Sequence, residues 1–163
     1  MLVLENTTDT LQVNLSGAVA TNQLQCYASY RDFTDSTYNA GRGAINTNGA
    51  SDVTIVAAPA ASTRRVVDFL SVYNQDTANA TVTIKLDANG TEYILVRLTL
   101  GIGERLEYAE GSGFRVIGDN GAVKTALANG SNVVASGLQM VTLGADVINN
   151  NATLNTMQDV TGS

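Results

Sequence analysis

The chain has 163 residues, of which 44% are hydrophobic and only 15% are charged. That length suits one domain with an appendage, and the charged fraction lies well below the roughly 25% of ordinary soluble domains, so solubility rests on Asn, Thr, Ser and Gly. The formal net charge of −6 argues against the clustered Lys and Arg that phosphate backbones attract, so neither nucleic acid nor an anionic membrane is an expected partner.

Cysteine usage and the N-terminus limit the possible settings further. Cys26 is the only cysteine, so no intrachain disulfide can form and the core must be held by packing. The opening residues, MLVLENTTDT, lack the basic segment and the apolar run of a secretory signal. No apolar stretch approaches the roughly 18 residues expected of a membrane span.

Short alternating segments separated by turn residues fill the chain from about residue 10 to residue 124, which predicts an antiparallel sandwich or barrel. Leu11, Val13 and Leu15 alternate with polar residues and predict a half-buried strand. Further strands are expected at 24–30, 52–57, 64–73, 81–87, 91–100, 105–108, 114–117 and 122–124. We therefore expect an all-β, antiparallel β-sandwich of eight or nine short strands, with jelly-roll and Ig-like topologies both open.

Local signals refine these expectations. The segment 64–73 is apolar enough for a helix, but its Val, Phe and Tyr content favours a central strand. Pro59 should end the strand before it. The pair Asn89-Gly90 between two alternating runs predicts a tight hairpin, because both central residues of a type I′ turn need positive φ. The glycine-rich stretch 32–49 is expected to be a long loop, with at most a short edge strand near 44–46.

Residues 125–163 differ in composition from the rest, because they contain no Lys or Arg and only two acidic residues. Their apolar content is too high for comfortable solvation as a flexible linker. We expect two parts: a β-sandwich domain at 1–124, and an extended C-terminal arm or the truncated start of a second β-domain at 125–163. The arm's candidate interface residues are Leu138, Met140, Leu143, Val147 and Ile148.

The residues offer little for catalysis. No histidine is present, which excludes Ser-His-Asp, Cys-His and His-metal sites. Carboxylate pairs such as Glu104 with Glu107, or Asp87 with Glu92, could in principle serve a glycosidase, but solvated hairpin residues are the simpler interpretation. The Asp- and Asn-rich turns do not complete a calcium loop. We expect no enzyme activity, no catalytic residue, no metal site and no cofactor.

Two groups of side chains are candidates for binding. Arg64 and Arg65 could pair with an acidic neighbouring subunit, although a strand-edge gatekeeper role would need no partner. The tyrosines Tyr27, Tyr30 and Tyr38 straddle the glycine-rich stretch and could form a docking or glycan patch, since aromatic residues are enriched in interfaces. Core packing beneath the loop is the alternative for this aromatic group.

Several stretches resemble a domain found in structural proteins of tailed bacteriophages. They are AAPAAST at 57–63, SVYNQDTANATVTI at 71–84, GTEYILVRLTL at 90–100 and LEYAEGSGFRVIGDNGAVK at 106–124. The segment GADVINNNATLNTMQDVTG at 144–162 is similar to a stretch that precedes a further β-domain in related phage proteins. The resemblance implies a β-sandwich on a virion, in a trimer or higher oligomer, attached through terminal segments.

The expected function is therefore a non-enzymatic structural component of a phage virion. Such a protein would decorate or stabilise the capsid, or form the base of a head fibre, by binding repeating subunits. Its expected partners are other copies of itself, as a trimer, and the major capsid or other virion proteins. It would be made in the host bacterial cytoplasm and reside at the particle surface. The alternative is a tail-fibre or baseplate module that binds a host surface glycan.

Overall fold

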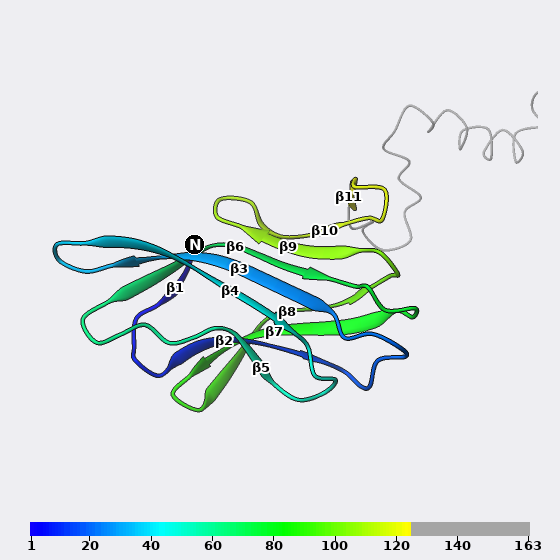
Figure 1. Cartoon of the computed structure of the whole chain (residues 1–163), viewed down its shortest axis with the longest axis horizontal. Coiled ribbons are helices and arrows are strands. Elements are labelled where there is room, and N and C mark those ends of the chain that lie inside the picture. Colours follow the sequence, from blue (N-terminus) through cyan, green and yellow to red (C-terminus); the bar gives the residue numbers. More distant parts are fainter. Residues whose placement is uncertain (125–163) are drawn as a thin grey trace, which may run out of the picture. The chain divides into compact units, whose positions relative to one another are not determined.

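A computed structural model describes residues 1–124, which form an all-β, antiparallel β-sandwich (Figure 1). The predicted fold class is thus confirmed. The strands are β1 (Leu2–Leu4), β2 (Asp9–Leu15), β3 (Gln25–Phe33), β4 (Tyr38–Asn46), β5 (Val53–Val56), β6 (Arg64–Tyr73), β7 (Ala80–Ala88), β8 (Thr91–Leu100), β9 (Arg105–Ala109), β10 (Gly113–Ile117) and β11 (Val123–Lys124). The expected arm at 125–163 lies outside the described residues.

The strands are divided between two sheets, which Figure 1 shows as two layers. Sheet A has the order β11-β10-β9-β6-β3-β4, and sheet B has the order β5-β2-β7-β8. The short strand β1 pairs with the start of β6 at Arg65, Val66 and Val67, whereas β9 pairs with its end, Phe69–Tyr73. One edge of β6 is therefore shared by two strands from distant parts of the sequence.

The core lies between the sheets and follows the alternation of the sequence. Leu11, Val13 and Leu15 of β2 are buried, as predicted, and so are Val82 and Ile84 of β7. Thr83 and Lys85, on the other face of β7, are buried as well. The reason is that β7 is flanked by β2 and β8, whose polar side chains cover that face.

Three local predictions are confirmed. The apolar segment 64–73 is strand β6, in the interior of sheet A, and β5 ends at Val56 ahead of Pro59. Asn89 and Gly90 form the two-residue turn between β7 and β8, with φ of 54° and 83°. The backbone N–H of Gly90 donates to Asp87 Oδ1 at 2.7 Å, which fixes the turn to the preceding strand.

The prediction of a long loop at 32–49 is wrong. β3 continues to Phe33 and β4 spans Tyr38–Asn46, so this stretch is mostly a long hairpin. The glycines that suggested a loop serve packing, because a Cβ at Gly41 would lie 2.4 Å from the Tyr30 ring. A Cβ at Gly43 would lie 2.0 Å from the carbonyl oxygen of Ile55. With β4 and the short β1, the described residues contain eleven strands where eight or nine were expected.

Candidate functional site

The three predicted tyrosines do not form one patch. Tyr27 and Tyr38 lie on the outer face of sheet A, whereas Tyr30 faces the core, because alternation along β3 places Tyr30 on the same side as the buried Cys26 and Ala28. Tyr38 packs against Phe33 with ring centroids 5.5 Å apart. Since Phe33 pairs with Tyr38 and Tyr27 pairs with Ala44, the two outer tyrosines are separated by about 20 Å along the hairpin.

The two predicted arginines, Arg64 and Arg65, also lie in different environments. Arg65 is buried, and its Nε and Nη2 donate to the two oxygens of Asp32 at 2.7 Å, while its Nη1 donates to the Ala57 carbonyl at 2.8 Å. Its guanidinium stacks on Tyr30, 3.9 Å from the ring centroid. The hydrogen bonds to Asp32 raise the pKa of Arg65 despite its burial. This arginine is therefore fully engaged within the chain.

Arg64, the neighbouring arginine, is instead solvent-exposed. Its side chain is 63% exposed and forms an ion pair with Glu5 at 3.0 Å. Exposed pairs of this kind contribute little stability, and the predicted pairing of Arg64 with a neighbouring subunit stays a prediction. The other predicted interface residues, Leu138, Met140, Leu143, Val147 and Ile148, lie outside the described residues.

Strand register gathers a second set of side chains on the outer face of sheet A. Asn46, Gln25, Tyr73 and Arg105 are successive cross-strand neighbours on β4, β3, β6 and β9. The next row on the same face contains Ala44, Tyr27, Ser71 and Glu107. Rows on one face are about 7 Å apart, and neighbouring strands about 5 Å, so these residues from four strands lie close together.

These two rows line an open hollow of about 740 Å³, which we call the tyrosine hollow. Tyr27 and Tyr73 are 41% and 39% exposed within it. Gln25, Asn46, Ser71 and Arg105 supply its polar groups. The buried Cys26 also lines it, and burial raises the pKa of this thiol to about 12, so that it stays protonated and unreactive near neutral pH.

The polar groups of the tyrosine hollow are largely uncommitted. Within residues 1–124, the side chains of Gln25, Asn46 and Ser71 have no hydrogen-bonding partner, and neither do the hydroxyls of Tyr27 and Tyr73. Arg105 pairs with Glu107 at 2.7 Å through Nη2, but its buried Nε has no acceptor in that range. The hollow thus combines two partly exposed rings with donors and acceptors that the described protein leaves free.

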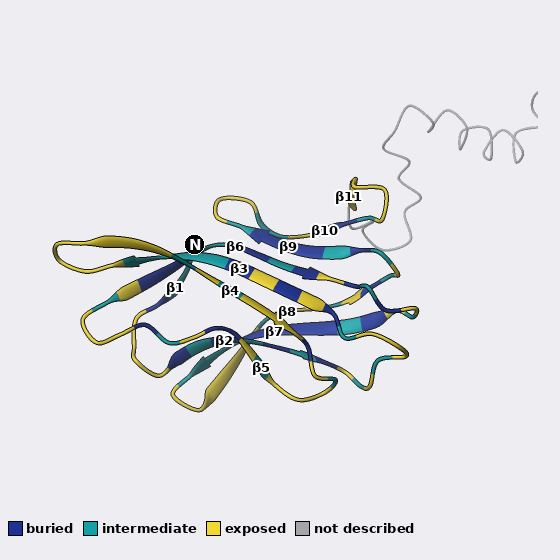
Figure 2. Cartoon of the chain, viewed as in Figure 1, coloured by how far each residue is buried: buried dark blue, intermediate teal, exposed yellow. Residues whose placement is uncertain are grey.

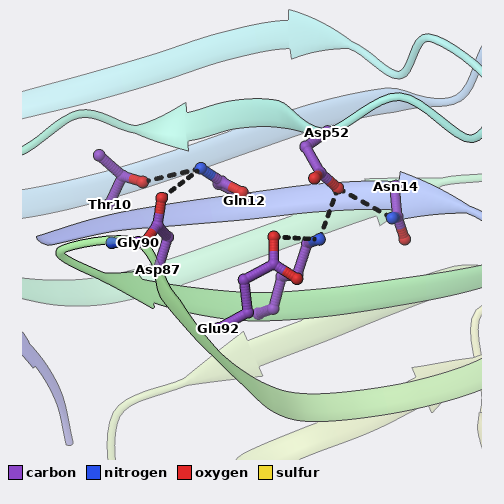
Figure 3. Close-up of polar contacts among 8 residues, drawn as sticks. Thr10, Gln12, Asn14, Asp52, Asp87, Gly90 and Glu92 are labelled. Atoms are coloured by element: carbon purple, nitrogen blue, oxygen red, sulfur yellow. Dashed lines mark hydrogen bonds and ion pairs between the residues drawn. The ribbon is translucent and has the colours of Figure 1, made fainter.

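The outer face of sheet B is the opposite case, because its polar side chains bind one another (Figure 3). Gln12 donates to Asp87 and Thr10 at 3.2 and 3.1 Å, and Asn14 donates to Asp52 at 2.8 Å. The buried Lys85 ammonium lies 2.7 Å from Asp52 and 2.8 Å from Glu92.

Burial would lower the pKa of Lys85, but its hydrogen bonds to Asp52 and Glu92 outweigh that effect and raise the pKa. The ammonium therefore stays charged near neutral pH. The carboxylates of Asp52 and Glu92 are in turn paired with this ammonium. This network, which we call the sheet B network, is satisfied internally and stabilises the sheet.

The carboxylates considered for catalysis are likewise engaged. Glu104 lies in the turn before β9, where the Gly101 N–H and Lys124 bind its carboxylate. Lys124 and the Gly101 N–H lower the pKa of Glu104. Glu107 pairs with Arg105 and Arg115 on the outer face of sheet A. Asp87 and Glu92 are cross-strand partners, but each carboxylate belongs to the sheet B network.

Residues 1–124 contain no group of three or more Cys, Asp or Glu side chains placed to hold a metal ion. In the same range, no helix is long and apolar enough to cross a membrane.

Comparison with protein-family models, with curated proteins and with solved structures finds no match to this chain.

The sequence did not reveal the tyrosine hollow as a unit. Tyr27 was a candidate, but Tyr73 and Arg105 were missed because they come from strands 46 and 78 positions further along the chain (73 − 27 and 105 − 27). The alternation within 64–73 places Tyr73 on the same face as Ser71, away from the buried Val72 and Leu70. That signal existed, but only the register of β3, β6 and β9 brings the two rows together.

Proposed function

We propose that the protein is a non-enzymatic structural component of a tailed-phage particle, in which copies join through their long edge strands. The resemblance in the sequence supports the phage setting. The observation that carries the assembly mechanism is the unequal length of the edge strands. Sheet A ends in β11, of 2 residues, and in β4, of 9; sheet B ends in β5, of 4 residues, and in β8, of 10.

Natural proteins keep edge strands short or charged, because an open edge pairs with other chains. β11 and β5 meet that rule, but β4 and β8 are longer than the usual strand of five or six residues. Most of β4 is exposed, as Figure 2 shows. On β8, Tyr93 and Ile94 are 55% and 63% exposed. Long exposed edges of this kind suit β-augmentation, in which backbone hydrogen bonds join two chains.

The two long edges lie on opposite sides of the sandwich. β4 lies against β5, since the Ile55 carbonyl approaches Gly43, and β5 and β8 are the two ends of sheet B. One copy can therefore pair its β4 with the β8 of the next copy. Such a head-to-tail contact generates a closed ring when the rotation between copies closes, and we propose a trimer presented at the particle surface on the major capsid protein.

The test changes one exposed isoleucine in β8. A lysine at an edge strand opposes pairing with another strand, so Ile94→Lys should reduce a trimer of three 17.0 kDa chains to monomers in light scattering. Ile102→Lys is the matched control, because Ile102 is 58% exposed but lies in the turn after β8. A wild type that stays monomeric, or two variants with the same mass as wild type, would contradict the edge-strand mechanism.

The particle role needs a separate measurement. Full-length chain should co-sediment with particles assembled from the major capsid protein of the same phage, and Ile94→Lys should bind them more weakly because avidity is lost with the trimer. Absence of the chain from purified particles by mass spectrometry would overturn the proposed particle role.

A further inference from the structure

We propose that the tyrosine hollow is a binding site for a pyranose sugar that carries a carboxylate, such as a hexuronic acid of a surface glycan. The hollow borders β4, one of the two edges proposed for assembly, but it is formed by side chains on the outer face of sheet A, whereas edge pairing uses the backbone groups of β4. The two proposals therefore use different groups of the protein. It replaces the tyrosine patch expected from the sequence, since Tyr27 remains but Tyr30 and Tyr38 lie elsewhere.

The two tyrosine rings provide the apolar part of the tyrosine hollow. Tyr27 and Tyr73 occupy adjacent rows on β3 and β6, so they stand diagonally across the strand pair, within reach of one ligand. Each ring has an apolar face and a hydroxyl, a combination that suits groups with one apolar and one polar side. The ring hydrogens of a pyranose form such an apolar face, while its hydroxyls point outward toward hydrogen-bonding groups.

Polar side chains without a partner in the described protein surround the two rings. Gln25, Asn46 and Ser71 lie around the rings with free amides and a free hydroxyl. On the outer face of sheet B, by contrast, neighbouring polar side chains are paired with one another. A few convergent polar groups beside aromatic side chains in a hollow are the usual composition of a small-ligand site.

The charge of the outer face of sheet A differs in sign from that of the whole chain. The outer face of sheet A carries five arginines, which are Arg31, Arg42, Arg64, Arg105 and Arg115, and four carboxylates paired with them, which are Glu5, Asp68, Glu107 and Glu110. Five cations less four anions leave a net charge of +1 on this face of a chain whose net charge is −6. A sugar carboxylate is attracted to that face and repelled by the rest of the surface.

Arg42 is the arginine best placed to use this attraction. It is exposed on β4, opposite Ser29 and one row from Tyr27, and it has no ion pair within residues 1–124. Arg105, inside the hollow, is only partly satisfied by Glu107. The two arginines lie on opposite sides of the rings, about 20 Å apart at Cα, so a single carboxylate can contact only one of them. We assign it to Arg42, which has no competing ion pair within residues 1–124, and the contact would be a charge-assisted hydrogen bond.

The test is a titration of the ¹⁵N-labelled full chain, followed by NMR, with the methyl glycosides of glucuronic and galacturonic acid. Methyl glucoside and methyl galactoside are the neutral counterparts. At least one uronide should give saturable shifts confined to the hollow, at Tyr27, Ser71, Tyr73 and the Arg105 side chain, with a dissociation constant of about 1 mM. Absence of saturable shifts with all four probes, or shifts centred elsewhere, would overturn the proposal.

Paired variants then test the roles of single residues. Tyr73→Ala should weaken uronide binding at least about tenfold, whereas Tyr93→Ala, which removes an exposed tyrosine of β8, should leave it unchanged. Arg42→Ala should remove the preference for the uronide over the neutral glycoside, and Arg97→Ala, an exposed arginine of sheet B, should keep it. Equal binding of uronide and neutral glycoside by wild type would refute the role given to the arginines.

The two proposals fail separately. Ile94→Lys should still bind the uronide as a monomer, and Tyr73→Ala should keep the mass of wild type. Loss of sugar binding in Ile94→Lys with an unchanged fold would show that the hollow is not an independent site.

Discussion

At Asp76 a single carboxylate joins two loops at one end of the sandwich. It accepts hydrogen bonds from the backbone N–H groups of Ala20, Thr21 and Asn22 at 2.8, 2.7 and 2.9 Å. These bonds, that of Asn22 above all, lower the pKa of Asp76 from 3.8 to about 2, although desolvation opposes them. Three successive N–H groups around one carboxylate form the kind of anion-binding nest that backbone turns provide.

The lowered pKa of Asp76 predicts where acid will weaken the fold. A carboxyl whose folded pKa is depressed contributes stability that is present above its unfolded pKa and is lost as pH falls through its folded pKa. That contribution should disappear between about pH 4 and pH 2. Asp76→Asn should be less stable than wild type near pH 7 in urea unfolding, and the difference should shrink across that interval.

The control for Asp76→Asn is Asp35→Asn. Asp35 is exposed in the turn between β3 and β4, and its carboxylate accepts no hydrogen bond within residues 1–124. Its replacement should change little at any pH. A difference between Asp76→Asn and wild type that stays constant from neutral pH to pH 2 would show that the carboxylate charge is not what stabilises these loops.

Two adjacent arginines show what a single sequence cannot predict about the environment of a residue. Arg64 and Arg65 are adjacent and chemically identical, yet one is exposed and the other is buried against Asp32 and Tyr30. Their opposite parity on a strand predicts different faces. Which face holds a carboxylate and a ring depends on the pairing of β3 with β6, and a single sequence does not carry that information.

Strand β4 contains a position at which any side chain would clash with sheet B. Gly43 faces sheet B where the Ile55 carbonyl crosses, and a Cβ there would approach that oxygen to 2.0 Å. Gly43→Ala must therefore push β4 and β5 apart. Because overpacking of a fitted interior costs about 1–3 kcal/mol, the free energy of unfolding should fall by that amount in urea denaturation.

Gly17→Ala is the matched control for this substitution. No atom lies within 4 Å of a Cβ at Gly17, and its φ is outside the left-handed region. An added methyl there should change stability by less than about 1 kcal/mol. Equal effects at the two glycines would mean that the approach of β5 to β4 is not a constraint on the fold.

The glycines of β4 also explain why the sequence misplaced this hairpin. Strands with clear alternation, such as β2 and β7, were predictable because their apolar residues recur with period two. The β7–β8 hairpin was predictable because Asn89-Gly90 is specific to its turn. In β4 two central positions on the side of the core, Gly41 and Gly43, are glycines, so the apolar alternation of a strand is interrupted, and only the close approach of Tyr30 and of the Ile55 carbonyl requires these positions to be small.

For the molecule as a whole, the sequence predicted an antiparallel sandwich but not its partition into sheets. Consecutive strands often lie in different sheets, since β2 and β5 belong to sheet B while β3 and β4 belong to sheet A. The tyrosine hollow depends on that partition, because Tyr27, Tyr73 and Arg105 share a face only through pairings between distant strands. Long-range pairing is set by the whole core, which is why a site of this kind follows from structure and not from motifs.

A core shared by both sheets predicts that they unfold together. Leu70 of sheet A and Ile84 of sheet B are fully buried in one cluster, so Leu70→Ala and Ile84→Ala should each cost about 2–5 kcal/mol. Five of the six tyrosines lie in sheet A, so tyrosine fluorescence reports mainly on that sheet. Ile84→Ala in sheet B should nevertheless shift the urea transition seen by fluorescence as far as the one seen by far-UV circular dichroism, as two-state unfolding requires.

Ile102→Ala is the matched control, because Ile102 is exposed in the turn after β8 and belongs neither to the core nor to the proposed interface. This substitution should leave both transitions nearly unchanged. If Ile84→Ala moved only the circular dichroism transition and left the tyrosine transition in place, the sheets would be separate folding units. The tyrosine hollow would then depend on sheet A alone, and its geometry would survive damage to sheet B. With a shared core, any substitution that loosens sheet B also weakens the platform on which the two tyrosines stand.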